Sequence, residues 1–117
     1  MILTGSTTAA KGLPNASLYA ASKAAVRNFA RSWIVELKGH DIRINVLSPG
    51  PTKTPGLLGM AAPEHQDALL DTLASTVPLG RVADPHETAT AAVFLASDAS
   101  SFINGIELFV DGGQAQI

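Results

Sequence analysis

The stretch Tyr19-Ala20-Ala21-Ser22-Lys23-Ala24-Ala25 decides the fold, because it lies near the start of a long segment with helical periodicity. Apolar residues recur at helical spacing beyond it, and Gly39 suits a helix end. The pattern predicts a helix that begins between residues 16 and 18 and ends at residue 38. On this helix Tyr19 and Lys23 are four residues apart, so they share one face.

Tyr19 and Lys23 form a candidate catalytic group with Ser6, which lies thirteen residues before the tyrosine. A free phenol has a pKa of about 10 and is a poor acid or base at neutral pH. A nearby cation favours the phenolate form, and a serine hydroxyl can hydrogen-bond the same substrate oxygen. The trio can therefore move a proton on or off an alcohol or carbonyl oxygen. Each residue alone also fits a plainer interpretation, as a helix-surface tyrosine, a solvated lysine and a strand-end serine.

The rest of the chain alternates between strand and helix patterns. Strands are predicted over residues 1–5, 42–48 and 106–110. Further helices are predicted over residues 63–75 and 85–96, and loops over residues 7–17 and 49–62. This alternation predicts a parallel sheet with right-handed crossovers.

Three features of the candidate site follow the ends of predicted elements. Ser6 ends the first strand, Pro49-Gly50 ends the second, and Tyr19 lies early in the helix between them. Ligands of open parallel sheets bind beyond the carboxyl ends of the strands. We therefore expect the three to meet on one rim of the sheet.

Several motifs, in this order and spacing, resemble those of the classical short-chain dehydrogenase/reductase family, and together they cover nearly the whole chain. They are Ser6, the Tyr-x-x-x-Lys motif of Tyr19 and Lys23, Ile42–Val46 followed by Pro49–Thr54, Asn104-Gly105, and Val110-Asp111-Gly112-Gly113. The resemblance implies an α/β fold with a partial Rossmann-like doubly wound parallel sheet over residues 1–117. It also implies an NAD(P)-dependent oxidoreductase that interconverts a secondary alcohol and a ketone.

The resemblance further implies a role for each site residue. Tyr19 would be the acid/base, Lys23 would contact the nicotinamide ribose and tune the tyrosine, and Ser6 would orient the substrate oxygen. The cofactor-binding residues would be these two, Tyr19 and Lys23, together with Pro49, Gly50, Thr52 and Thr54. Residues 55–80 correspond to the family's variable substrate loop, and Asp111 to a structural turn.

One family element is missing from these 117 residues. No glycine-rich dinucleotide motif occurs, so the chain looks like the C-terminal, catalytic half of a family member. NAD and NADP cannot be told apart without that half. Two interpretations stay open: an active oxidoreductase that forms a homodimer or homotetramer, and a truncated, catalytically silent domain kept as an oligomerisation or interaction module.

Composition excludes several other classes of function. Apolar residues make up 46%, charged residues only 15%, and the net charge is −2. The sequence has no cluster of basic residues that would bind nucleic acid. No apolar run is long enough to span a membrane. His40, His65 and His86 do not have the spacing of metal ligands, so a metal site is not expected. The absence of cysteine fits a cytoplasmic protein. The low charge predicts surfaces covered by another part or another subunit.

Overall fold

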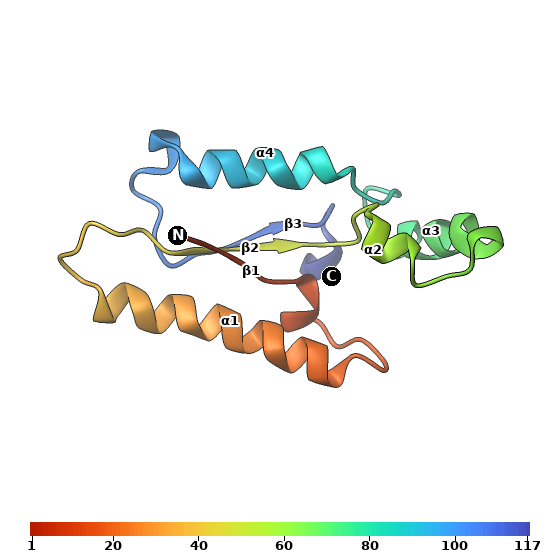
Figure 1. Cartoon of the computed structure of the whole chain (residues 1–117), viewed down its shortest axis with the longest axis horizontal. Helices are drawn as coiled ribbons and strands as arrows, with labels where there is room; N and C mark the ends of the chain where they lie inside the picture. Colours follow the sequence, from red (N-terminus) through yellow and green to blue (C-terminus); the bar gives the residue numbers. More distant parts are fainter.

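The computed structural model describes residues 1–117 and shows a three-stranded parallel sheet between two helices (Figure 1). The strands β1 (Ile2–Thr4), β2 (Asn45–Pro49) and β3 (Glu107–Val110) lie in the order β1-β2-β3. Helix α1 (Ser17–Glu36) covers one face of the sheet, and α4 (Pro85–Ala96) covers the other (Figure 1). Helices on both faces of a parallel sheet confirm the predicted α/β fold class.

The two crossovers differ in hand, so the expectation that both are right-handed is wrong. The strand order advances in one direction from β1 to β3, yet the connecting helices lie on opposite faces (Figure 1). Two successive crossovers of the same hand would place both helices on one face. The second crossover also contains a long excursion between Pro51 and Asp84, which separates β2 from α4.

Strand β2 begins at Asn45, later than predicted, because Arg43 binds the end of α4 instead. The Arg43 guanidinium donates to the carbonyl oxygens of Leu95 and Ser97 at 3.1 and 3.2 Å, and to Ser100 Oγ at 2.9 Å. The last carbonyls of a helix have no intrahelical partner, and a cation there also complements the helix dipole. Arg43 therefore holds the C-terminal end of α4 against the segment that enters β2.

The segment predicted as a loop over residues 49–62 contains one helical turn, α2 (Pro55–Leu58). Thr54 caps this turn, because its Oγ1 accepts a hydrogen bond from the Leu57 amide at 3.2 Å. A threonine N-cap followed by proline at the first helical position is a favourable helix start. The sequence held this signal, and the prediction of a continuous loop was wrong.

The other two predicted helices are present, α4 with the predicted bounds and α3 with shifted ends. Helix α3 spans Gln66–Ala74, and a 3-10 turn occupies the first residues of the range 63–75. At the start of α4, Asp84 Oδ1 accepts from the His86 amide and Glu87 Oε2 accepts from the Asp84 amide, both at 2.8 Å. Aspartate followed three residues later by glutamate, ahead of an apolar run, is the sequence pattern of such a reciprocal cap. The 3-10 turns are η1 (Thr7–Ala9), η2 (Pro63–His65), η3 (Asp98–Ser100) and η4 (Gln114–Gln116).

A small buried cluster lies between α1 and the sheet. Its buried members are Ala30, Ile44 and Val46, with Leu3, Trp33, Ile34 and Leu37 packed against them. Leu47, Val77 and Leu95 are buried outside this cluster. The chain exposes 7279 Å², whereas a compact monomer of this mass exposes about 6,000 Å². Large apolar side chains contribute to the excess, including Leu18, Val35, Val93 and Phe102. That another part of the protein or another subunit covers these apolar side chains stays a prediction. None of the helices combines the length and the hydropathy that a membrane crossing requires.

Candidate active site

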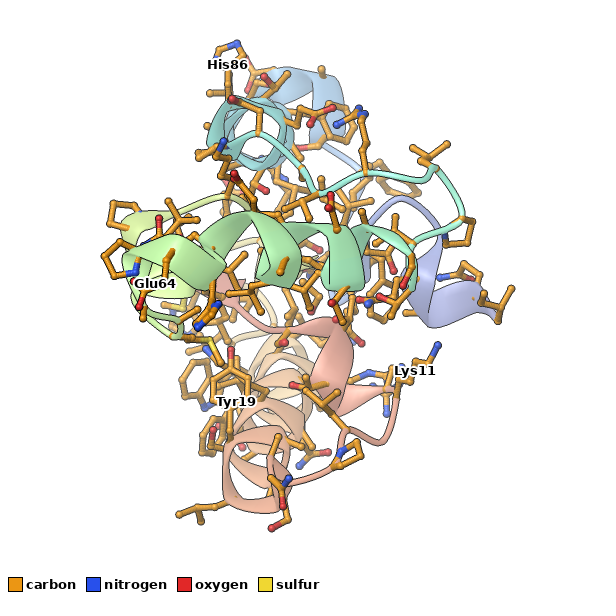
Figure 2. The ribbon with its side chains drawn as sticks, turned by 90° about the vertical axis from the view of Figure 1, so that its right-hand side faces the viewer. Lys11, Tyr19, Glu64 and His86 are labelled. Atoms are coloured by element: carbon orange, nitrogen blue, oxygen red, sulfur yellow. The ribbon has the colours of Figure 1, made fainter.

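The candidate residues gather at the end of the sheet where β1 and β2 terminate. Ser6 follows β1 by two residues, Pro49 is the last residue of β2, and Tyr19 is the third residue of α1. Helix α1 packs against the turn η1 that follows Ser6. Figure 2 looks onto this end of the molecule, with Tyr19 on α1 and Glu64 in the excursion above it in the view. The expected rim is therefore present.

Tyr19 and Lys23 lie together on one face of α1, as predicted. The Lys23 ammonium is 5.6 Å from the centroid of the Tyr19 ring, within cation–π range. It also donates a hydrogen bond to the Thr4 carbonyl oxygen at 3.0 Å, which ties the lysine to the end of β1. The Tyr19 side chain is about half exposed, at 51%. A ligand can thus reach the phenol while the lysine stays fixed beside it.

Ser6 is nearly buried, at 8% exposure, and is held by its neighbour Thr8. Strand β1 ends at Thr4, before the predicted boundary, and Ser6 instead caps the turn η1. Its Oγ accepts hydrogen bonds from the Thr8 amide at 3.2 Å and from Thr8 Oγ1 at 3.0 Å. No hydrogen bond joins Ser6 to Tyr19. Since the Ser6 oxygen already accepts two donors, its own proton remains available for a ligand oxygen.

Gly50 lies where β2 and β3 end side by side. A Cβ atom at this position would come 2.8 Å from both Cα and Cβ of Asp111, closer than real side chains approach. Asp111 is itself fixed, because its carboxylate oxygens accept from the Gly113 and Ala115 amides at 2.9 and 2.7 Å. The turn at Asp111 is thus structural, as expected. Packing between the two strand ends is sufficient to require glycine after Pro49.

Thr52 and Thr54 use their hydroxyls within their own segment. Thr52 Oγ1 donates to the Gly50 carbonyl at 3.0 Å, so this hydroxyl already has an acceptor. Thr54 Oγ1 accepts from the Leu57 amide and keeps its proton free to donate. The backbone at Thr52 pairs with Ala83, which closes the base of the excursion. Of the two hydroxyls, Thr54 is the better candidate for contacting a ligand.

Comparisons with known proteins agree with this geometry. A family model described as enoyl-(acyl carrier protein) reductase matches residues 1–115. Oxidoreductase asL5 of Sarocladium schorii is 45% identical over 117 residues, which are 100% of this chain and 45% of that protein. A structure described as a short chain dehydrogenase family protein from Francisella tularensis has a TM-score of 0.90 and 30% identity, covering 99% of this chain and 50% of that one. The chain belongs to the short-chain dehydrogenase/reductase family.

A second relative in the short-chain dehydrogenase/reductase family is the cis-4-hydroxycyclohexanecarboxylate dehydrogenase of Sinomonas cyclohexanicum. It is 43% identical over 108 residues, which are 92% of this chain and 41% of that protein. The chain thus spans a little under half the length of the two curated relatives.

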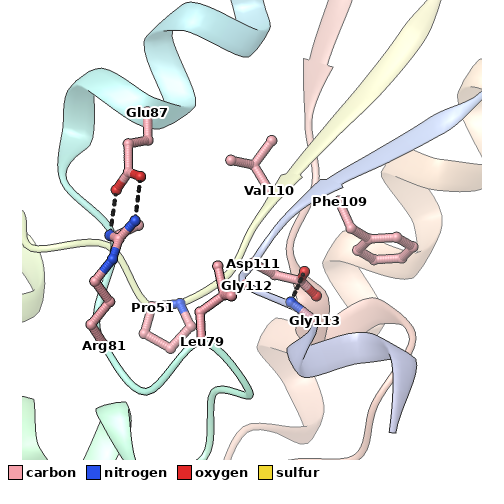
Figure 3. A pocket seen from close by; sticks show the side chains of 10 residues that line it. Pro51, Leu79, Arg81, Glu87, Phe109, Val110, Asp111, Gly112 and Gly113 are labelled. Carbon is pink, nitrogen blue, oxygen red and sulfur yellow. Dashed lines mark hydrogen bonds and ion pairs between the residues drawn. The ribbon is translucent and has the colours of Figure 1, made fainter.

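A cavity of about 510 Å³ lies beside the end of β3 in this member of the short-chain dehydrogenase/reductase family (Figure 3). None of Ser6, Tyr19 and Lys23 lines it. An ion pair stands at its edge, in which the two Arg81 Nη atoms each lie 2.7 Å from a Glu87 carboxylate oxygen. This hydrogen-bonded arginine, together with the Asp84 amide, lowers the pKa of Glu87 to about 2. The cavity is lined by Pro51, Leu79, Arg81, Ala83, Glu87, Phe109, Val110, Asp111, Gly112 and Gly113.

Sequence reasoning missed two polar residues near the serine. Thr8 could have been found, because threonine two positions after serine is a local pattern for side-chain bonding to a turn. Gln114 carried no local signal. It bonds Thr7 and Thr76, which lie 107 and 38 positions away in the chain.

Proposed function

We propose that this chain is the catalytic half of an NAD(P)-dependent oxidoreductase domain that interconverts a secondary alcohol and a ketone. The observation that carries the proposal is the pairing of Tyr19 with Lys23, whose ammonium lies 5.6 Å from the ring centroid at the rim of the sheet. Ser6 lies on the same rim with its proton uncommitted. These three supply a proton donor, a cation beside it and a hydrogen-bond donor for one oxygen.

The proposed roles follow from the contacts of each group. In ketone reduction Tyr19 donates its phenolic proton to the carbonyl oxygen, and Ser6 donates a hydrogen bond to the same oxygen. Lys23 holds a positive charge beside the Tyr19 ring, 5.6 Å from its centroid, next to the group that gives up the proton. In alcohol oxidation the same residues act in reverse. The nicotinamide supplies or accepts the hydride when it is bound.

The donor set fits the nicotinamide half of such a cofactor. Lys23 has three ammonium protons and spends one on Thr4, so two remain for the hydroxyls of a ribose. The Thr54 hydroxyl keeps a free proton, while the Thr52 backbone and Pro49-Gly50 lie along the same segment. The choice between NAD and NADP rests on residues outside these motifs. Because residues 1–117 contain no glycine-rich phosphate loop, we expect this chain alone to bind either nucleotide only weakly. Submicromolar binding would contradict that expectation.

The substrate class we propose is a compact, largely apolar alcohol or ketone. The excursion above the rim carries Leu57, Leu58, Met60, Leu69 and Leu70. Matches described as a hydroxycyclohexanecarboxylate dehydrogenase and an enoyl-(acyl carrier protein) reductase support trying cyclic alcohols and acyl thioesters first. Sugars, polyols and steroids complete the panel.

The test is nucleotide-linked turnover by the protein that the complete gene encodes. NADH and NADPH oxidation would be followed with each ketone and 3-oxoacyl thioester, and the reverse reaction with each alcohol. We expect turnover with at least one pair of nucleotide and substrate. Absence of turnover across the panel, in protein shown to be folded, would overturn the proposal.

A second candidate function is a catalytically silent oligomerisation module. It is favoured by the excess of exposed surface and by exposed apolar residues on both helices, such as Leu18 on α1 and Val93 on α4. A homodimer or homotetramer would cover these faces in an active enzyme as well. The discriminating measurement is the mass and oligomeric state of the natural protein, combined with the turnover panel. Oligomers without nucleotide binding or turnover would favour the silent module, whereas turnover would exclude it. We place either form in the cytoplasm, which the absence of cysteine supports.

A further inference from the structure

We propose that Gln114 is a positioning residue that couples the serine loop to the lid segment. The serine loop is defined as residues 6–11. The lid segment is defined as residues 55–80, which connect β2 to α4 in the chain and lie over the rim of the sheet. The proposal deepens the proposed function and rests on it, because it assigns these two segments to opposite sides of one substrate site.

The Gln114 side chain bridges the two segments directly. Its Oε1 accepts a hydrogen bond from Thr7 Oγ1 at 3.2 Å, and its Nε2 donates to Thr76 Oγ1 at 2.8 Å. Thr76 gives its own proton to the Leu73 carbonyl at 2.7 Å, so its oxygen is left to accept. The amide therefore has a fixed orientation, with its oxygen toward the serine loop and its nitrogen toward the lid segment.

The backbone around Gln114 is built to hold the end of the lid segment. The Leu79 amide donates to the Gly112 carbonyl at 3.2 Å. A Cβ atom at Gly112 would lie 2.5 Å from Val77 Cγ1, and one at Gly113 would lie 3.2 Å from Pro78 Cγ. Both glycines have positive φ angles of 62° and 92°. The turn that follows β3 thus fits closely against residues 77–79 and presents Gln114 between the two segments.

The other side of the bridge leads to the candidate catalytic serine. Thr7 is buried and adjoins Ser6 in the chain. The Gln114 backbone carbonyl also accepts from Lys11 Nζ at 3.2 Å, so both ends of the serine loop are tied to this residue. Through these contacts Gln114 sets where Ser6 stands relative to the lid segment. It touches no reacting atom and acts by position.

The first test is hydrogen exchange of backbone amides in the protein that the complete gene encodes. Thr76→Val removes the lid contact and leaves the serine loop untouched. If Gln114 couples the two segments, Thr76→Val speeds exchange in residues 7–11 as well as in the lid segment, by about three- to tenfold for the loss of one neutral hydrogen bond. In a Gln114→Ala background, Thr76→Val has no further effect on residues 7–11. Thr76→Ser retains the hydroxyl and is the matched control, with wild-type exchange expected.

The second test uses kinetics of the same variants. Gln114→Ala and Thr7→Val are expected to raise KM for the carbonyl substrate by about three- to tenfold, with KM for the nucleotide unchanged. Simple loss of folded protein would lower the rate without changing either KM. Thr7→Ser is expected to restore wild-type KM.

The two proposals fail in different ways. The coupling is overturned if Thr76→Val leaves the exchange rates of residues 7–11 unchanged. It is also overturned if Thr76→Val changes these rates equally in the wild-type and Gln114→Ala backgrounds. Both outcomes hold whether or not the protein shows turnover. An unchanged substrate KM in Gln114→Ala would also overturn it. Absence of any turnover in the wild-type protein would overturn the proposed function, while the exchange experiment would still decide the coupling.

Discussion

Replacing Arg43 should destabilise the fold more than replacing any exposed arginine. The Arg43→Met variant keeps the length of the side chain and removes donors to two helix-end carbonyls and to the Ser100 hydroxyl. A hydrogen bond to a charged group contributes about 1.5–3 kcal/mol. Ser100 still donates to the Leu95 carbonyl at 3.0 Å, and the Arg43 hydrogen bonds are only partly buried. We therefore expect a loss of about 2–4 kcal/mol in the free energy of unfolding, which is smaller than the sum of the separate bonds.

The measurement is urea unfolding at fixed protein concentration, followed by the fluorescence of Trp33. This tryptophan is the only one in the chain and packs against the buried core, so its signal reports loss of tertiary structure. The matched control is Arg31→Met, because Arg31 is exposed on α1 and makes no hydrogen bond. We expect the control to change stability by less than about 0.5 kcal/mol. The reasoning is refuted if Arg43→Met costs no more than Arg31→Met.

Two further perturbations test the cavity edge and the strand ends. The pKa of Glu87 is lowered from its ordinary 4.5 to about 2, so its ionised form stabilises the fold above pH 4.5, and this contribution is lost as the pH falls from 4.5 to about 2. Acid titration of stability should therefore be shallower in Glu87→Gln over that range, and an unchanged titration would contradict the role of the Arg81 pair. Gly50→Ala places a methyl 2.8 Å from Asp111 main-chain and side-chain carbons, which should cost about 1–3 kcal/mol in urea unfolding. The matched control Gly12→Ala has open space around the new methyl, and equal effects at the two glycines would contradict the packing account.

Features set by neighbours in the chain could be predicted from the sequence. The Asp84 cap of α4 uses a residue three positions away, and Tyr19 and Lys23 meet because they are one helical turn apart. The presence of the three strands also follows from local apolar patterns, and their parallel pairing from their alternation with helices. The turn α2, which was not predicted, is also set by neighbours in the chain, because Thr54 and Pro55 form a recognisable helix start.

Features set by distant partners could not be predicted. Arg43 leaves the predicted strand because its acceptors lie 52 to 57 positions away. Gly50 suggests a close approach to a cofactor, yet the nearest atoms of the chain belong to Asp111, which directly follows the neighbouring strand β3. The unequal hands of the crossovers depend on the path of the long excursion, which no single motif encodes. The candidate catalytic residues could therefore be identified from the sequence. Thr8, which bonds Ser6, and Gln114, which bonds Thr7, were assigned from the structure.

The central claim is that Tyr19 transfers the proton to or from the substrate oxygen. The most direct measurement is turnover of the Tyr19→Phe variant, using the protein that the complete gene encodes and its best nucleotide and substrate. We expect turnover to fall by about 10²–10⁴-fold, the usual contribution of a positioned acid or base. The matched control is Ser22→Ala, whose hydroxyl only bonds the Tyr19 carbonyl at 2.7 Å and which should keep wild-type activity. Near-wild-type turnover by Tyr19→Phe would contradict the claim.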